Sequence, residues 1–189
     1  MNKDILGNFY RRMLPLYPPR TEALLRRTSP SDLQRLTFRY IFTVDGMIEI
    51  SHMIEDLIVS SPGVSETHVS FQYFSRLAPQ MERYRLVAQS SRGLWLYGVP
   101  DVQLPELPNT VYVDTTATPL EHYWYVLAYG PGLSATLLAE ELTPEERLAG
   151  EPRMYEGFYT FEADTAFQVL EVLHQLFPGK VPLPGLYTT

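Results

Sequence analysis

Histidine is the side chain in this sequence best suited to acid–base or metal chemistry, and the chain has four of them. No two histidines have the spacing of a zinc-binding pair on a helix. The nearest approach to half of a metal site is Glu49-x-x-His52, with Asp56 on the same face of an expected helix. Di-iron bundles use such a pair twice, together with further glutamates. A solvated helix face is the simpler interpretation, so we expect no metal and no cofactor.

The chain also lacks the local patterns that activate a nucleophile or hold a phosphate. It has no G-x-S-x-G turn and no P-loop. Gly130-Pro131-Gly132 is expected within a hairpin, where it cannot place a helix N-terminus against a phosphate. The acid pairs Glu140-Glu141 and Glu145-Glu146 are interpreted as exposed charge. We therefore expect a protein that is not an enzyme.

Composition excludes further classes of protein. The sequence has no cysteine, which excludes disulfides, thiol sensing, iron–sulfur clusters and chromophores attached through a thioether. It has no apolar run long enough to span a membrane, and its first residues lack the apolar stretch of a secretory signal. We therefore expect a cytoplasmic protein with no membrane partner.

The net charge of −7 is unevenly distributed. Residues 1–40 hold eight basic and three acidic side chains, whereas the rest of the chain holds seven basic and 19 acidic ones. This pattern predicts a basic arm and an acidic body. The arm could dock on its own body, on a second copy or on an acidic partner. An acidic body argues against a broad nucleic-acid surface.

Hydrophobic periodicity predicts a βαβ unit in the first half of the body. A helix is expected over 44–59, a strand over His68–Phe74, a helix from Pro79 and a second strand over Leu94–Val99. The two strands of such a unit should be parallel.

The second half of the body predicts a hairpin and a closing helix. Residues 121–129 and 133–141 flank a glycine-rich turn, and the first run is bulky on both faces, as in a central strand. Together with a strand over Thr110–Asp114, an extended piece over Phe158–Phe161 and a helix over Glu162–Phe177, this gives an α/β or α+β fold. We expect a mixed sheet of about five strands with a C-terminal β-hairpin and helices packed over it.

Three regions follow along the chain. Residues 1–40 form a basic helical arm, residues 41–177 form the body, and residues 178–189 form a proline-rich tail. The tail has no evident role in the core, so it is interpreted as either a loose end or the start of a linker.

Five segments of the body resemble segments of one known family, and they occur along the chain in the same order as in that family. The central one is FQYFSRLAPQMERYRLVAQ at 71–89, which resembles the signature of DICT domains. The other four are ISHMIED at 50–56, YGVPD at 97–101, PLEHYWYVLAYGPGLSATLLAEEL at 119–142 and YEGFYTFEADTAFQVLEVL at 155–173. Glu162 stands where the closing motif has aspartate, which keeps the charge.

The resemblance implies a non-catalytic sensory module associated with diguanylate cyclases and two-component systems, whose signal is not established. Its expected partners are a histidine kinase, a response regulator or a cyclase. The alternative is a scaffold or interaction protein without a small ligand. A cleft that joins His122 to Glu121 or Asp114 would instead favour an enzyme.

Ligands of open α/β sheets gather at the carboxyl ends of parallel strands. This places an expected ligand pocket among aromatic and polar residues at the ends of the two parallel strands: Phe71, Gln72, Tyr73, Tyr97 and Asp101.

The arm carries the expected partner-binding residues. Residues 4–14 form a short amphipathic helix, which must pack on something because so short a helix is not stable alone in water. We expect a homodimer in which residues 1–40 supply much of the contact, through Phe9, Tyr10, Met13, Arg26 and Arg27.

Overall fold

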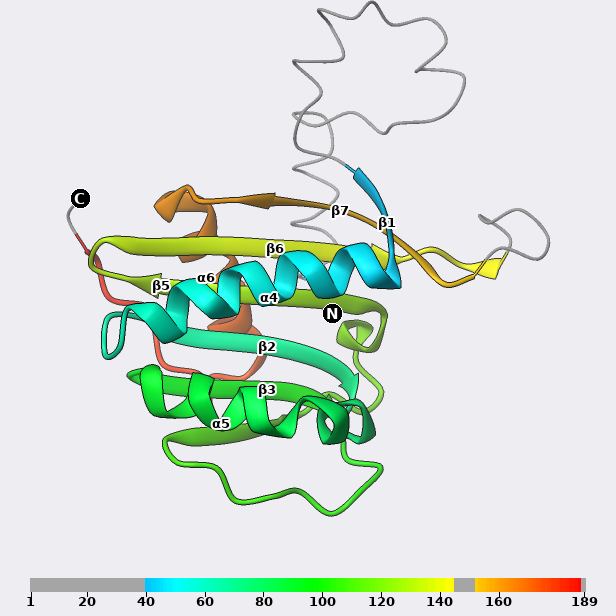
Figure 1. Cartoon of the computed structure of the whole chain (residues 1–189), viewed down its shortest axis with the longest axis horizontal. Coiled ribbons are helices and arrows are strands. Elements are labelled where there is room, and N and C mark those ends of the chain that lie inside the picture. The colour runs from blue at the N-terminus through cyan, green and yellow to red at the C-terminus, as the bar shows by residue number, and fades with distance from the viewer. Residues whose placement is uncertain (1–39, 145–151, 188–189) are drawn as a thin grey trace, which may run out of the picture.

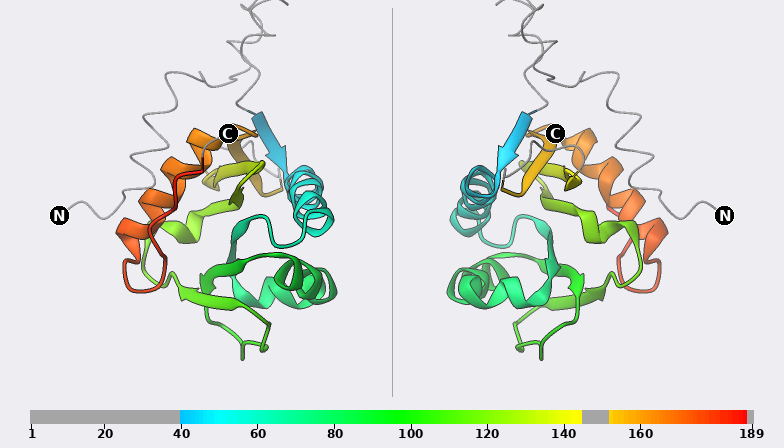
Figure 2. Two further views of the ribbon diagram at one scale, coloured as in Figure 1. Left: turned by 90° about the vertical axis from the view of Figure 1, so that its left-hand side faces the viewer. Right: turned by 90° about the vertical axis from the view of Figure 1, so that its right-hand side faces the viewer.

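The computed structural model describes residues 40–144 and 152–187, which form a seven-stranded sheet with helices on both faces (Figure 1). Two helices, α4 and α5, cover one face, and α6 covers the other (Figure 2). In chain order the elements are β1 (Tyr40–Thr43), α4 (Val44–Ser60), β2 (Glu66–Tyr73), the 3-10 helix η1 (Phe74–Gln80), α5 (Met81–Ser90), β3 (Gly93–Val99), β4 (Thr110–Asp114), the 3-10 helix η2 (Pro119–His122), β5 (Tyr123–Gly130), β6 (Leu133–Glu141), β7 (Met154–Thr160) and α6 (Ala163–Leu176).

The sheet is mixed, with strand order β1-β7-β6-β5-β2-β3-β4. β2, β3 and β4 run parallel to one another, and all other neighbours are antiparallel. The β2–η1–α5–β3 segment is the expected βαβ unit, and β5–β6 is the expected hairpin. β5 is the central strand and is buried along almost its whole length, as its two bulky faces predict.

Each face of the sheet carries its own hydrophobic core. Under α4 and α5 the core includes Met47, Ile54, Tyr84 and Leu96. Under α6 it is formed largely by tyrosines of β3 and β5 and by the apolar side of the helix. Because helices cover both faces of the sheet, a functional site is expected to be bordered by the loops at the strand ends and by the helix starts next to them.

The strand count is the main difference from the expected fold, since the sheet has seven strands and not about five. β1 was not expected, because four residues leading directly into α4 are too few to show a strand period. β7 begins at Met154, earlier than the expected extended piece at Phe158. The helix expected from Pro79 begins at Met81, since Pro79 lies within η1.

The proline-rich tail lies against the body up to residue 187, on the same side as α6 (Figure 2). Val181 is buried in the α6-side core, and its carbonyl contacts Nδ1 of His174 at 2.7 Å. The Trp95 indole donates to the carbonyl of Lys180 at 2.9 Å. The tail therefore has a part in the core that its composition did not suggest. The expected arm, residues 1–40, lies outside the described residues except for Tyr40.

Candidate functional site

A cavity of about 230 Å³ lies between the two helices of one face and the sheet beneath them. α4 supplies Val44, Ile48 and His52, and β2 supplies Val69 and Phe71. Further walls come from η1, the start of α5, β5 and Arg153, which just precedes β7. The cavity is thus positioned by most of the elements on this side of the sheet.

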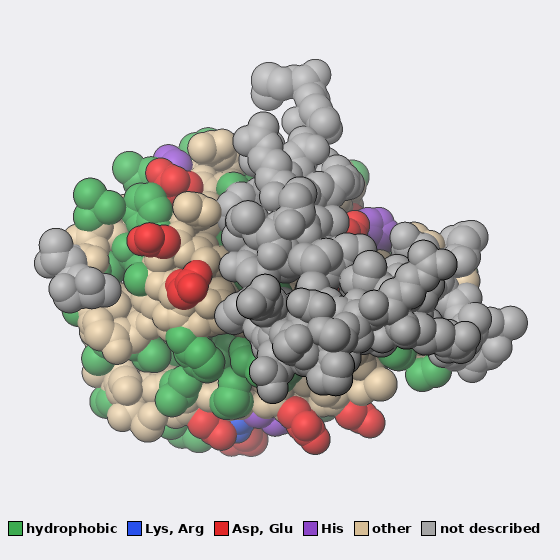
Figure 3. All heavy atoms as spheres, turned by 90° about the horizontal axis from the view of Figure 1, so that it is seen from above, with side chains coloured by type: hydrophobic (Ala, Val, Ile, Leu, Met, Phe, Trp, Pro, Cys, Tyr) green, Lys and Arg blue, Asp and Glu red, His purple; other side chains and the backbone are tan. Residues whose placement is uncertain are grey.

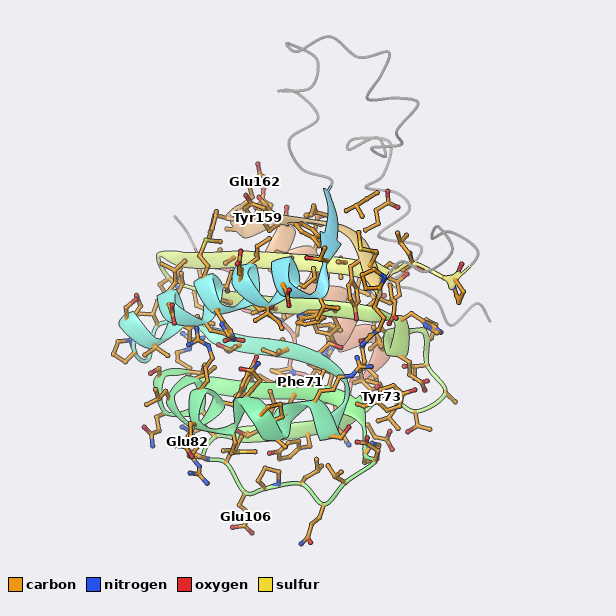
Figure 4. The ribbon with its side chains drawn as sticks, turned by 45° about the vertical axis from the view of Figure 1, so that its right-hand side comes forward. Phe71, Tyr73, Glu82, Glu106, Tyr159 and Glu162 are labelled. Atoms are coloured by element: carbon orange, nitrogen blue, oxygen red, sulfur yellow. The ribbon has the colours of Figure 1, made fainter. Side chains whose placement is uncertain are left out.

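The walls of the cavity are mainly apolar and aromatic. Phe71 meets Tyr84 edge to face, with ring centroids 4.8 Å apart. Trp124 is held by its indole N–H, which donates to Ser51 of α4 at 3.1 Å, and it also packs edge to face on Tyr155. Figure 4 shows Phe71 between α4 and α5, and Tyr73 at the end of β2. Such walls suit a flat or branched apolar group.

One end of the cavity is basic, because the guanidinium groups of Arg76 and Arg153 meet there. Arg153 is paired with Glu141 in a two-bond fork, with Nε and Nη2 each 2.7 Å from a carboxylate oxygen. Both arginines also donate to the side-chain carbonyl of Gln72. Charge-assisted forks of this kind are geometrically specific.

Gln72 is the centre of this polar end, and its own backbone is unusual. Its φ of 63° lies in the left-handed region, where β2 shifts register against β3. Its side-chain amide donates to the carbonyl of Glu121 and to Glu141, at 3.0 Å each. The amide is therefore fixed with its oxygen toward the arginines. A non-glycine residue held in this conformation is a feature that often accompanies functional sites.

Burial and neighbouring charges shift the pKa values of the ionisable groups at this end of the cavity. Burial would raise the pKa of Glu141, but hydrogen bonds from Arg153 and Gln72 lower it below its ordinary value. Burial and the neighbouring Arg153 lower the pKa of Arg76. Burial also raises the pKa of Tyr155 to about 12, so its hydroxyl stays protonated and donates to Gln72 at 3.0 Å.

A second charged group holds α4 to α5 along the side of the cavity. Glu55 of α4 is buried, and it accepts hydrogen bonds from Arg83 and from the hydroxyl of Tyr84. Arg83 also binds Asp56 at 2.7 Å and the carbonyl of His52 at 3.0 Å. Asp56 of the expected solvated face is thus exposed but paired with α5, and His52 contacts Gln80 at 3.3 Å.

Of the five expected ligand residues, the structure brings two to this site. Phe71 lines the cavity, and Gln72 organises its basic end. Tyr73 is exposed at the end of β2, under the guanidinium of Arg76. Asp101 is exposed and accepts from the backbone N–H of Ser75 at 2.9 Å. Tyr97 is fully buried in the α6-side core, on the other face of the sheet.

Tyr97 lies apart because successive residues of a strand face opposite sides. Leu96 of β3 faces the cavity side, and its neighbour Tyr97 contacts His68 Nδ1 at 2.9 Å beneath α6. The prediction rested on the carboxyl ends of the two parallel strands and did not consider which face of the sheet each side chain takes. The expected partner-binding residues Phe9, Tyr10, Met13, Arg26 and Arg27 lie outside the described residues.

The sequence did not point to Arg76, Arg153, Glu55 or Glu141. Glu141 was interpreted as exposed, but its side chain is only 23% exposed and is paired with Arg153. Glu55 was hidden among the apolar positions of α4. The sequence held one indication of these residues. Basic residues are scarce after residue 40, so each of them is a candidate partner for a carboxylate or a ligand.

The described residues do not form the cleft between His122 and a carboxylate that would favour an enzyme. His122 is exposed, while Glu121 and Asp114 accept hydrogen bonds from backbone groups of the loop between them. Within residues 40–144 and 152–187 there is no cluster of three or more His, Cys, Asp or Glu side chains that could hold a metal ion. In the same residues no helix combines the length and the hydropathy needed to cross a bilayer.

Comparison with known proteins adds the fold and the family. The structure is similar to part of the crystal structure of polyphosphate kinase from Porphyromonas gingivalis, with a TM-score of 0.52 and 16% sequence identity. The match covers 92% of this chain but 31% of the kinase, so the likeness concerns the fold alone. No curated protein matches the sequence. The family model for DICT, the sensory domain in diguanylate cyclases and two-component systems, matches residues 31–142. This match covers more than half of the chain, and the chain therefore belongs to the DICT family.

Proposed function

We propose that this DICT domain is a sensory module that binds a small ligand in the cavity beneath α4 and α5. It passes on its occupancy by contact with a signalling protein, such as a histidine kinase, a response regulator or a cyclase. The observation that carries the proposal is the cavity itself, with aromatic walls and two guanidinium groups converging at one end. Apolar pockets with a few convergent polar groups are the usual form of small-molecule sites.

The arrangement of the walls also offers a way to relay binding. The cavity is bounded by α4 on one side and by η1 with α5 on the other. These two sides are tied to each other by Glu55, Arg83 and Tyr84. A ligand between them would change how α4 sits relative to α5, and both helices present their outer sides to a partner. A ligand shifts such an equilibrium only by its differential affinity for the two arrangements.

The experiment is a thermal-shift screen of neutral, cationic and anionic metabolites against wild type and two matched variants. Ile48→Trp fills the cavity from α4, whereas Met53→Trp places the same ring on the exposed side of the same helix. We expect at least one compound to raise the Tm of wild type and of Met53→Trp but not of Ile48→Trp. A screen in which no compound separates these proteins would contradict the proposal.

A scaffold without a small ligand remains the second candidate, and one observation favours it. Met53 and Leu57 of α4 and Leu86 of α5 are exposed apolar side chains on the two outer helices. Under this alternative, Leu86→Asp would abolish binding to a signalling partner while Ile48→Trp would leave it intact. The reverse result favours the ligand-binding module.

A further inference from the structure

The basic end of the cavity has more hydrogen-bond donors than acceptors. The side-chain oxygen of Gln72 accepts from Arg76, from Arg153 at 2.8 Å and from the Tyr155 hydroxyl at 3.0 Å. An amide oxygen has two lone pairs. Three donors therefore converge on one neutral acceptor. Arg153 also donates to Glu141 and to the Tyr155 hydroxyl oxygen, whereas Arg76 has only the Gln72 oxygen among the described acceptors. A further acceptor placed between the two guanidinium groups would remove this excess.

Among the described residues, the same end has one arginine without an ion pair. Glu141 neutralises Arg153 through the two-bond fork. The described residues contain five arginines, and Arg76 is the one among them with no ion pair to a described carboxylate. Its guanidinium is nevertheless half-buried beside the cavity. Burying a charge without a partner is costly, so such a charge is a place for a counter-ion.

The size and walls of the cavity limit what can bring that counter-ion. Its volume of about 230 Å³ is below the ~300–1,000 Å³ of pockets for drug-sized ligands. Phe71, Tyr84 and Trp124 form aromatic walls beside the basic end. One ring or one branched aliphatic group fits this space together with a single acid group.

We infer that the ligand is a small monocarboxylate with an apolar body, whose carboxylate binds Arg76 and Arg153 while its body lies against Phe71 and Trp124. This inference rests on the proposed function, whose site it uses. A carboxylate is preferred to a phosphate because the group of Arg76, Arg153 and Glu141 has a net charge of +1, which one monoanion neutralises. The planar guanidinium of Arg76 also matches a carboxylate through two hydrogen bonds.

The test uses the full chain and three probes that each carry one phenyl ring and one polar head group, measured by isothermal titration calorimetry. The probes are phenylacetate, its neutral amide phenylacetamide, and phenylphosphonate. We expect phenylacetate to bind at least about tenfold more tightly than phenylacetamide, since its carboxylate adds an ionic attraction to the guanidinium groups that the neutral amide lacks. Binding should be constant near neutral pH and should weaken as the pH falls through ~4, where the ligand carboxylate takes up a proton.

Two variants test whether Arg76 is the residue that binds the carboxylate of phenylacetate. Arg76→Gln keeps a donor but removes the charge, and it should lower the affinity for phenylacetate at least about tenfold without changing that for phenylacetamide. Arg85→Gln, an exposed arginine of α5 paired with Glu82, should change neither. Arg76→Gln should also have a Tm no lower than wild type, because it removes a half-buried charge that has no ion pair to a described carboxylate. This makes a loss of binding separable from a loss of fold.

Three outcomes would overturn the inference. One is equal binding of phenylacetate to wild type and to Arg76→Gln. Another is much tighter binding of phenylphosphonate, which would make the ligand a phosphate. The third is no binding of phenylacetate at millimolar concentration. In each case the proposed function stands if the metabolite screen still finds a compound that Ile48→Trp fails to bind, and it fails together with the inference if the screen finds none.

Discussion

The hydroxyl of Tyr84 is buried and donates to the buried carboxylate of Glu55 at 2.5 Å, which joins α5 to α4. Hydrogen bonds to charged groups contribute more than those between neutral groups. Tyr84→Phe should therefore lower the free energy of unfolding by about 1.5–3 kcal/mol. Urea denaturation of wild type and of this variant measures the difference in the free energy of unfolding.

The control for this prediction is Tyr112→Phe, because the Tyr112 hydroxyl donates to a neutral acceptor, the carbonyl of Pro105, at 2.7 Å. Its loss should be smaller, about 0.5–1.5 kcal/mol. An equal loss in the two variants would show that the charge of Glu55 contributes nothing to the contact.

His68 should make the protein sensitive to mild acid. It is stacked on Trp95, its Nε2 has no hydrogen-bond partner among the described residues, and burial lowers its pKa to about 3. The unfolded chain takes up this proton near pH ~6.5, whereas the folded protein does not until about pH 3. The contribution of His68 to stability is thus complete above pH ~6.5 and is lost as the pH falls toward 3. Between pH 7 and 5 the loss is about 2 kcal/mol.

The measurement compares urea midpoints at pH 7 and pH 5 in His68→Gln and in His122→Gln, an exposed histidine. The first variant should lose less stability on acidification than wild type, whatever its stability at pH 7, and the second should lose as much as wild type. An unchanged acid sensitivity in His68→Gln would contradict this account.

At the residue scale the sequence indicated part of the site. Phe71 and Gln72 were expected from their place at the end of a parallel strand. Phe71 lines the cavity, and Gln72 binds the two arginines that line its basic end. Arg76 and Arg153 are 77 positions apart, and they meet only because β7 lies in the same sheet as β2. Such long-range proximity has no local signal in one sequence.

At the level of elements, β6 and β7 pack closely because β7 has a glycine where a side chain would not fit. A Cβ at Gly157 would lie 2.2 Å from the carbonyl oxygen of Leu138 and 2.5 Å from Cα of Ala139. These are backbone atoms that cannot move away without separating the strands. Gly157→Ala should therefore lower the free energy of unfolding by about 1–3 kcal/mol or more.

Gly179→Ala is the matched control, because no atom lies within 4 Å of a Cβ built there. It should leave the urea midpoint nearly unchanged. If Gly157→Ala is as stable as this control, the close approach of the two strands is not a constraint on the fold.

The elements that the sequence predicted best are those with long local patterns. The helix over 44–59 and the hairpin around Gly130-Pro131-Gly132 appear within a few residues of their expected bounds. β1 has four residues and was not expected. Tyr97 was expected at the site from its place near the end of β3, but the alternation of that strand puts it on the other face from Leu96. Local periodicity thus predicts elements better than it predicts which side chains share a face.

On the scale of the whole molecule, charge separates the two parts of the chain. Acidic side chains are spread over the coloured part of the face shown in Figure 3, where few basic ones are visible. Four of the five arginines in the described residues are paired with acids of the body itself. Residues 41–189 still hold an excess of acidic side chains, whereas positions 1–40 hold an excess of basic ones.

This charge separation leads to the prediction on assembly. We expect full-length protein to be a homodimer of about twice the 21.7 kDa chain mass, and a chain that lacks residues 1–39 to be a monomer. The reason is that the apolar side chains expected on the helix over 4–14 each gain about 1.5–3 kcal/mol on burial and need a surface to cover them. Multi-angle light scattering at micromolar concentration measures both masses.

The charge of the arm is tested separately. The double variant Arg26→Glu/Arg27→Glu should weaken the dimer. The wild-type dimer should also weaken as added salt shortens the Debye length from about 10 Å at 0.1 M. A monomeric full-length chain contradicts the prediction, whereas a truncated chain that stays dimeric places the interface on the body.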